Sequence, residues 1–327
     1  MDPTIHLGQR PMADGYRIFA EREACGVSPV YEDWARRLAD DDAVLAQLET
    51  LQRAKRQPNL VFAAARWHGA RDSYDSLRTT LLDRWQDVQG TVLSRATQTN
   101  EAARCAVLLP FLAELPQPLA LIEVGASAGL CLLPDRYSYR YDDGTSLDPV
   151  AGPSDVVIDC HLGEGIAPPP AMPEVVWRAG LDLNPVDVTD DDACAWLETL
   201  VWPGQEDRRR RLSAALGVAR REPPRVITGD LLEALPALAQ EAPTDATLVV
   251  FHSAVLAYVE ADARERFVEL ASGLPGHWIS NEGPAVLPGL AREARRGDGR
   301  FLLAVDGEPR ALTDPHGRSV AALSAIS

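Results

Sequence analysis

The first third of the chain and the remainder differ in the spacing of their apolar residues. Residues 10–115 show steps of three and four, which predict helices, and Ser28 with Pro29 is a candidate helix start. From residue 119 the apolar residues gather into runs of strand length, at 119–124, 156–159, 175–182, 225–228, 247–252, 276–280 and 301–305. Helix-like segments separate several of these runs, an alternation that is typical of βαβ units and a mostly parallel sheet.

The pattern predicts a helical N-terminal cap region over residues 1–118 and an α/β domain over residues 119–327. The expected fold class of the second part is a doubly wound, Rossmann-like sheet. The stretch 135–166 interrupts the alternation, because its spaced tyrosines and the pair Asp143-Gly144 resemble an antiparallel hairpin. We expect this stretch to be an insertion in the first crossover.

Composition narrows the class of protein. With 46% hydrophobic and 24% charged residues the chain resembles an ordinary globular protein, and its net charge of −16 disfavours nucleic acid as a partner. No apolar run reaches about 18 residues and no signal peptide opens the sequence, so we expect a cytoplasmic protein with no membrane partner. The five cysteines are far apart, which predicts neither a disulfide framework nor a metal site.

Residues 121–130, L-I-E-V-G-A-S-A-G-L, admit two interpretations. The G-x-S-x-G spacing around Ser127 matches the nucleophile elbow of a serine hydrolase. That interpretation is disfavoured, because the residues upstream are predicted helical and supply no sheet for an elbow. As a glycine turn after the first strand, Gly125 and Gly129 would let the backbone approach a cofactor. The turn lacks the second glycine of G-x-G-x-x-G, which disfavours NAD.

The order of acids along the chain favours S-adenosyl-L-methionine (SAM) as the cofactor. An acid at the end of the second strand would accept the ribose hydroxyls, and Asp182 occupies that place, with Asp159 as the alternative. After the third strand, Asp230 would accept from the adenine amino group. Arg104 is expected to form an ion pair with the cofactor carboxylate. The predicted cofactor-binding residues are Arg104, Glu123, Gly125, Ser127, Gly129, Asp182, Asn184, Asp230 and Leu231.

The fourth predicted strand ends in polar residues that would face the transferred methyl group. His252 is the expected general base, since the pKa of an imidazole suits proton transfer near neutrality, and the Tyr258 hydroxyl is expected at the same site. Residues expected at the acceptor are Asn100, Glu101, Trp202, Gln205, Ser253 and Glu282. The turn 202–205 is interpreted as a lid over that acceptor.

Five stretches carry a resemblance to a known family: Q-T-N-E-A-A-R-C at 98–105, E-V-G-A-S-A-G-L at 123–130, R-A-G-L-D-L-N-P-V-D-V at 178–188, L-V-W-P-G-Q at 200–205 and V-F-H-S-A-V-L-A-Y at 250–258. The sequence resembles the bacterial family of domain of unknown function 2332, whose body is similar to a class I SAM-dependent methyltransferase. The resemblance implies that fold and no particular reaction.

Together these features predict SAM-dependent methyl transfer to an unidentified small molecule. The sequence is also compatible with a homodimer. Two alternatives remain open. One is a non-catalytic protein that binds SAM or a nucleoside, and the less favoured one is a serine hydrolase that uses Ser127.

Overall fold

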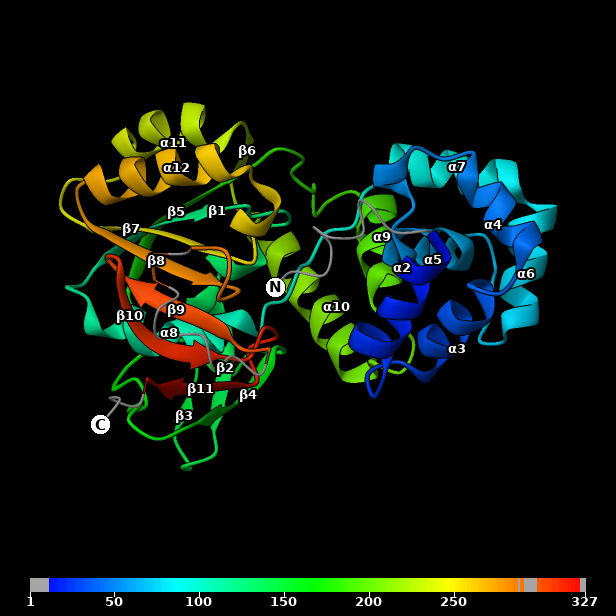
Figure 1. Cartoon of the computed structure of the whole chain (residues 1–327). Helices are drawn as coiled ribbons and strands as arrows, with labels where there is room; N and C mark the ends of the chain where they lie inside the picture. Colours follow the sequence, from blue (N-terminus) through cyan, green and yellow to red (C-terminus); the bar gives the residue numbers. More distant parts are fainter. Residues whose placement is uncertain (1–11, 288, 291–298, 324–327) are drawn as a thin grey trace. The chain divides into compact units, whose positions relative to one another are not determined.

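The structure, a computed structural model, describes residues 12–287, 289–290 and 299–323, which form two compact units (Figure 1). The helical unit consists of the described part of Asp2–Thr99 together with Asp191–Arg210. The α/β unit consists of Asn100–Asp190 and the described part of Arg211–Ser327. This division differs from the predicted boundary near residue 118, because the α/β unit begins at Asn100 and the helical unit takes in a later segment.

Short helices build the first unit. They are α2 (Met12–Phe19), the π-helix η2 (Ala20–Ala24), α3 (Pro29–Leu38), α4 (Asp42–Glu49), the 3-10 turn η3 (Arg53–Lys55), α5 (Pro58–Trp67), α6 (Tyr74–Asp83), α7 (Trp85–Ser94), α9 (Asp191–Leu200) and the first turns of α10 (Glu206–Arg221). The predicted start of α3 is confirmed: Ser28 Oγ accepts from Tyr31 N at 3.4 Å, and Pro29 takes the first helical position.

An aromatic cluster forms the centre of this unit. Phe62 of α5 is fully buried and contacts the rings of Tyr31 and Trp34, with centroid distances of 5.1 and 5.4 Å. Burial of such rings supplies much of the apolar driving force in a unit of this size. The apolar run at residues 60–64 lies inside α5 and is buried along its whole length.

Side-chain contacts fasten α9 to the helices that precede it by about a hundred residues. The Arg95 guanidinium lies over the rings of Trp67 and Trp196, at 4.6 and 5.0 Å from their centroids, and also pairs with Asp192. Trp196 Nε1 donates to the carbonyl of Ala96 at 3.0 Å. These contacts explain why residues 191–210 belong to the helical unit.

One sheet of eleven described strands organises the second unit, in the order β3-β2-β4-β11-β10-β9-β8-β7-β1-β5-β6. The strands are β1 (Leu119–Val124), β2 (Ser138–Tyr141), β3 (Ser146–Leu147), β4 (Val157–Leu162), β5 (Val175–Asp182), β6 (Val226–Thr228), β7 (Thr247–Ser253), β8 (His277–Glu282), β9 (Phe301–Val305), β10 (Glu308–Thr313) and β11 (Ser319–Ala322). The pairs β6-β5, β5-β1, β1-β7 and β7-β8 are parallel, which agrees with the predicted mostly parallel sheet.

The insertion after β1 extends the far end of this sheet. Strands β2 and β3 pair antiparallel around Asp143-Gly144, as predicted, while β4 pairs with β2 and β11. The chain then returns to β5, which lies beside β1. This excursion accounts for the long sequence separation between the first two adjacent parallel strands.

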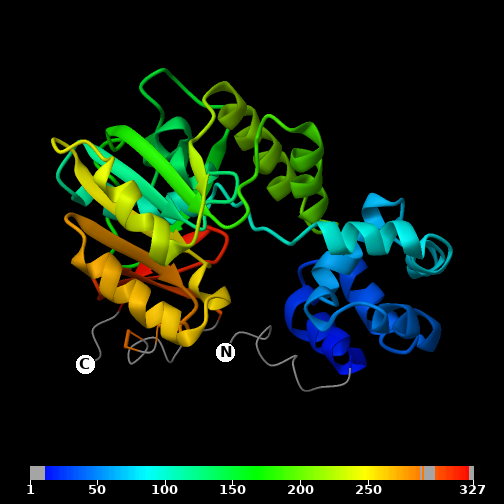
Figure 2. The same cartoon turned by 90° about the horizontal axis from the view of Figure 1, so that it is seen from above.

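Helices cover both faces of the sheet. Helices α11 (Leu231–Gln240) and α12 (Ala261–Gly273) lie side by side on one face, and α8 (Arg104–Glu114) lies on the other (Figure 1 and Figure 2). The layer under α11 and α12 contains Ile122 and Val124 of β1. Because successive side chains of a strand point to opposite faces, Glu123 faces the α8 side. Short 3-10 turns complete the unit: η4 (Leu130–Leu132), η5 (Pro134–Arg136) and η6 (Leu256–Tyr258).

Strands β10 and β11 were not predicted. Their segments are short and mixed in polarity, and β10 contains Pro309 at an irregularity in its pairing with β9. Such strands are specified by their neighbours more than by their own pattern. In the described part of the chain, no helix has the length and apolar character that crossing a membrane requires.

We predict that Arg95→Ala lowers the free energy of unfolding by about 1–2 kcal/mol, because it removes the cation between Trp67 and Trp196. Arg95→Lys should lose part of this, since an ammonium does not stack as a planar guanidinium does. Urea denaturation followed by tryptophan fluorescence measures the change. Arg36→Ala, which breaks an exposed pair with Glu32, is the control, with a loss of about 0.5 kcal/mol or less. Equal losses in the two alanine variants would refute the role assigned to Arg95.

Candidate functional site

The loop after β1 has an unusual backbone. Gly125, Ser127 and Gly129 have φ angles of 72°, 50° and 68°, so every second residue adopts the left-handed conformation. Glycine adopts this conformation without strain, whereas a serine does so at a cost. The glycine turn that the sequence predicts is therefore present at the carboxyl end of β1, with Ser127 in a conformation that favours glycine.

The end of β5 holds this turn in place. The carbonyl of Leu181 accepts from Gly125 N at 2.7 Å, and Asp182 Oδ2 accepts from Ser127 N at 2.8 Å. Asp182 Oδ1 accepts from Asn184 N at 2.7 Å. Three of the predicted cofactor residues thus lie together with Gly125 at the edge where two neighbouring parallel strands end.

The alternative acid, Asp159, lies elsewhere. It is on β4, opposite Arg140 of β2. Five strands, β11, β10, β9, β8 and β7, lie between β4 and β1 in the sheet. The structure therefore places Asp182, and not Asp159, beside the glycine turn.

Asn100 closes the other side of the turn. Its Nδ2 donates to Ser127 Oγ at 3.0 Å, and its Oδ1 accepts from Ala128 N at 3.0 Å. Helix α8 begins four residues later, at Arg104, and has no side-chain cap. The amide of Asn100 is thus available to the turn because it is not needed at a helix start.

Glu123 is a buried acid just before the turn. Its side chain is 7% exposed, and within the described residues its Oε2 has no hydrogen-bond partner. Burial raises the pKa of the Glu123 carboxyl well above its usual range, the neighbouring Cys131 thiol adds to the rise in pKa, and the Arg104 guanidinium opposes it. A buried carboxyl of this kind is a frequent feature of functional sites.

Arg104 and Glu101 lie on the same side of the sheet as Glu123. Arg104 Nη1 donates to the carbonyl of Ser253 at 2.9 Å, and its Nε donates to that of Pro315 at 2.9 Å. Glu101 is 3% exposed, and its Oε1 accepts from Arg211 Nε at 3.0 Å. Both predicted residues are therefore buried and engaged with the protein.

Ser253 belongs to a buried polar row on that face. Asn281 Nδ2 donates to Ser253 Oγ at 3.0 Å, and Thr313 Oγ1 donates to Asn281 Oδ1 at 2.6 Å. Asn281 lies next to Glu282, which the sequence placed at the acceptor. Thr313 was missed, because nothing in its own segment connects it with a residue 32 positions earlier.

His252 and Glu282 point to the opposite face, under α12. His252 is fully buried, stacks on Trp278 with a centroid distance of 5.9 Å and has Phe267 edge-on at 5.4 Å. Its Nδ1 donates to Glu282 Oε1 at 2.7 Å. The sequence suggested that both residues face a bound acceptor, whereas the structure places them inside the apolar layer.

The remaining predicted residues of the α/β unit follow β6 and β7, and the loop after β6 contacts the end of β5, where Gly229 N donates to the carbonyl of Asp182 at 3.0 Å. Asp230 caps α11 by accepting from Leu232 N at 2.8 Å, and Leu231 packs in the layer beneath that helix. Tyr258 is 78% exposed in η6 after β7.

Trp202 and Gln205 belong to the helical unit. Trp202 contacts Phe19 and Tyr31 at centroid distances of 5.3 and 5.6 Å, and Gln205 Oε1 accepts from Arg208 Nη1 at 3.2 Å. Their proposed contact with an acceptor stays a prediction.

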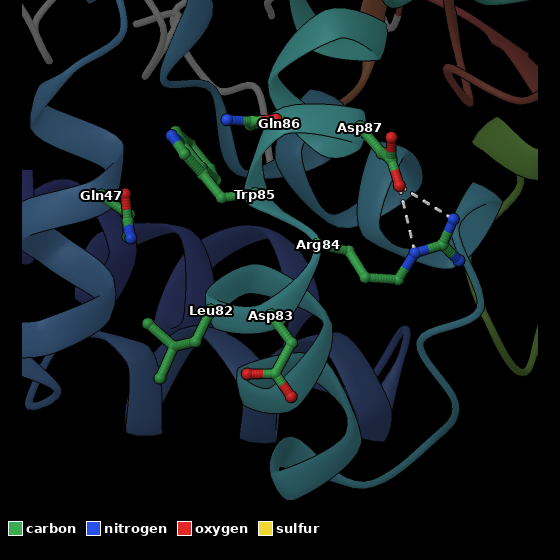
Figure 3. Close-up of a pocket in the computed structure, with 7 residues that line it drawn as sticks. All are labelled: Gln47, Leu82, Asp83, Arg84, Trp85, Gln86 and Asp87. Carbon is green, nitrogen blue, oxygen red and sulfur yellow. Dashed lines mark hydrogen bonds and ion pairs between the residues drawn. The ribbon is translucent and has the colours of Figure 1, made fainter.

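A pocket of about 400 Å³ lies in the helical unit, between α4 and the junction of α6 with α7 (Figure 3). Trp85 contributes its ring, and Arg84 pairs with Asp87 at 3.0 Å. The lining residues are Gln47, Leu82, Asp83, Arg84, Trp85, Gln86 and Asp87. None of the predicted site residues lines this pocket.

Comparison with protein families gives one result. The model of a family described as uncharacterized protein conserved in bacteria (DUF2332) matches residues 13–73 and 65–321. The chain belongs to the DUF2332 family. No curated protein matches the chain, and no solved structure matches it. Membership of the DUF2332 family carries no reaction, so the function must be argued from the geometry described above.

We predict that Gly125→Ala destabilises the protein more than Gly144→Ala does. Both glycines have positive φ, so an alanine is strained at either position by about 1–3 kcal/mol. A Cβ at Gly125 would also overlap the methyl groups of Val255, whereas one at Gly144 would meet nothing within 4 Å. Thermal denaturation measures both variants, and Gly125→Ala with Val255→Ala should recover part of the loss. Equal destabilisation by the two glycine variants would contradict the packing of Val255 on the turn.

We predict that Glu123→Gln becomes more stable relative to the wild type as pH rises. The folded pKa of Glu123 lies above its unfolded value of about 4.5. The stability that its proton provides is complete below pH 4.5 and is lost as pH rises towards the folded pKa. Thermal unfolding from pH 4.5 to 8 tests this.

Glu241→Gln is the control for this experiment. The Arg225 guanidinium lowers the pKa of Glu241, so this substitution should lower stability at neutral pH. A difference between Glu123→Gln and the wild type that does not change with pH would show that the charge of Glu123 is not the cause.

Proposed function

We propose that this protein binds SAM at the turn after β1 and transfers its methyl group to a small molecule. The observation that carries the proposal is the alternating left-handed turn of residues 125–129, held by Asp182 of the neighbouring parallel strand. In open α/β sheets, nucleotide-like ligands bind outside the carboxyl ends of the strands, next to such a glycine turn.

The strand order supports the same place. Numbered by their order along the chain, the five parallel strands β6-β5-β1-β7-β8 run 3-2-1-4-5, as in a doubly wound sheet. The direction of chain progression reverses between β1 and β7, and ligands of such sheets bind at that reversal. Gly125 directly follows β1, and Ser253 is the last residue of β7.

Residues around the turn fit the chemical groups of SAM. Each Asp182 oxygen accepts one backbone N–H, so each retains a lone pair for a ribose hydroxyl. Leu183 follows directly and is 65% exposed, which suits contact with an adenine ring. The buried Glu123 and Arg104 carry opposite charges when ionised and suit the ammonium and carboxylate of the amino-acid tail.

When bound, SAM supplies an electrophilic methyl group on a sulfonium. The chain contributes orientation, by fixing its backbone at the turn through Asp182 and Asn100, and this can supply a large part of the acceleration of a two-substrate reaction. With a cationic ligand at the turn, the buried Glu123 carboxyl would lose its proton and would supply negative charge in a place shielded from water. His252 is no longer the favoured base, because its ring is buried under α12 and its Nδ1 is bound to Glu282.

Calorimetry with SAM and with S-adenosylhomocysteine tests the proposal. We expect the wild type to bind both and Asp182→Asn to weaken SAM binding at least tenfold, because the amide places an N–H group where Ser127 N or a ribose hydroxyl must donate. Asp187→Asn is the matched control, since Asp187 also accepts from a backbone N–H two residues on, at Thr189. An absence of binding at millimolar SAM would reject the proposal.

The same proteins separate the alternatives. Binding without transfer of labelled methyl groups to a broad panel of small molecules would favour a non-catalytic binding protein. A serine hydrolase predicts ester turnover that Ser127→Ala abolishes and that Asp182→Asn leaves in place. We expect no such turnover, because Ser127 Oγ is bound to the amide of Asn100.

A further inference from the structure

We propose that Glu282 and His252 are a positioning pair, which fixes the turn after β7 against the glycine turn after β1. The pair thereby shapes the site without touching the ligand. The inference rests on the proposed function only where ligand binding is the readout. The structural claim is that the buried Glu282 carboxylate fixes the backbone positions of the two neighbouring turns, and this claim does not depend on a ligand.

Glu282 collects three hydrogen bonds on a single oxygen. Oε1 accepts from His252 Nδ1 at 2.7 Å, from Val255 N at 2.9 Å and from Leu256 N at 3.1 Å. Its side chain is 2% exposed. Three hydrogen bonds converge on one carboxylate oxygen away from water, so this oxygen defines where residues 255–256 lie.

The turn after β7 has a strained backbone that needs support from neighbouring residues. Ala254 has φ of 58°, in the left-handed region that a residue with a Cβ rarely adopts, and its N–H donates to the carbonyl of Asn281 at 3.1 Å. Such strain persists only where the surroundings determine the backbone. Here β8 supplies both constraints, through the main chain of Asn281 and the side chain of Glu282.

Val255 transmits this position to the glycine turn. Its methyl groups occupy the space where a Cβ of Gly125 would lie. Gly125 N in turn donates to the carbonyl of Leu181. A chain of contacts therefore runs from Glu282 through Val255 to Gly125, and from there to the end of β5.

His252 completes the pair from beneath. By donating from Nδ1, the ring helps to orient the Glu282 carboxylate, and the ring is itself held by stacking on Trp278 and by the edge-on contact with Phe267. Within the described residues, His252 Nε2 and Glu282 Oε2 are buried without a hydrogen-bond partner. Burying such atoms costs stability, so an apolar pair would suit the layer better if packing were its only purpose.

Amide hydrogen exchange of the full chain tests the structural claim. Glu282→Ala should raise exchange at Val255 and Leu256 and also, at least tenfold, at Gly125. Glu282→Gln should restore most of the protection, because its amide oxygen can still accept from both N–H groups. This rescue separates an acceptor role from simple loss of packing.

The control is Asp306→Asn. Asp306 makes contacts of the same kind at the other end of β8, accepting from His277 Nδ1 at 2.7 Å and from Trp278 N at 2.8 Å. We expect faster exchange at Trp278 and no change at Gly125. Should Glu282→Ala fail to fold, Val255→Ala replaces it: exchange should rise at Gly125 while Leu256 stays protected. If Glu282→Ala folds, or if Val255→Ala folds in its place, and amide exchange at Gly125 is unchanged in that variant, the inference is overturned.

Calorimetry with SAM supplies the second readout. Glu282→Ala should weaken SAM binding at least tenfold, and Asp306→Asn should leave it within twofold of the wild type. If the wild type binds no SAM while exchange behaves as expected, the proposed function fails and the positioning pair stands. If the wild type binds SAM and Glu282→Ala binds equally well, the inference is overturned while the proposed function stands.

Discussion

The hydrogen bond from the Ser127 backbone N–H to the Asp182 carboxylate joins the ends of two neighbouring parallel strands. The rest of the site depends on it, because the left-handed turn between Gly125 and Gly129 has little regular structure of its own. Pairing of β1 with β5 brings the acid to this place, although 59 positions separate Asp182 from Glu123 in the sequence numbering. The insertion that causes this separation lies at the far end of the sheet, so it lengthens the chain without disturbing the turn.

Polar groups are buried on both faces of the sheet near this turn, and their arrangement differs between the two faces. On the α8 face, Glu123 and Arg104 are buried ionisable side chains beside the turn, and burial raises the pKa of the Glu123 carboxyl well above its usual range. Under α12, His252 and Glu282 form a closed pair within apolar residues. Neither arrangement is what stability alone would select, since buried ionisable groups lower the free energy of unfolding unless they are fully satisfied. Glu123, His252 and Glu282 lie near the carboxyl ends of the neighbouring parallel strands β1, β7 and β8, which points to a site for which the fold gives up stability.

The sequence predicted the central strands well, and β1, β5 and β9 have the predicted bounds. Their apolar runs are strong local signals, whereas β10 and β11 depend on neighbours. The helical unit was predicted without residues 191–210, because the hydrogen bonds from Trp196 to Ala96 and from Arg66 to Val201 join distant segments and have no local pattern. The face on which His252 lies was equally hidden. Strand β7 is apolar on both faces, so its pattern does not tell whether His252 or Ser253 points towards α8.

The letters G-x-S-x-G fit two kinds of site because both need a tight turn after a strand. A left-handed serine also suits a nucleophile elbow, so the φ of Ser127 does not decide between them. The surroundings do more: the turn leads into the short η4 instead of the helix that follows an elbow, and Asn100 holds the serine hydroxyl. With Asp182 bound to its N–H and Asn100 bound to its hydroxyl, Ser127 is constrained on both sides. This arrangement favours the proposed role of Ser127 in shaping the turn, because the hydroxyl of a nucleophile would have to donate to a base.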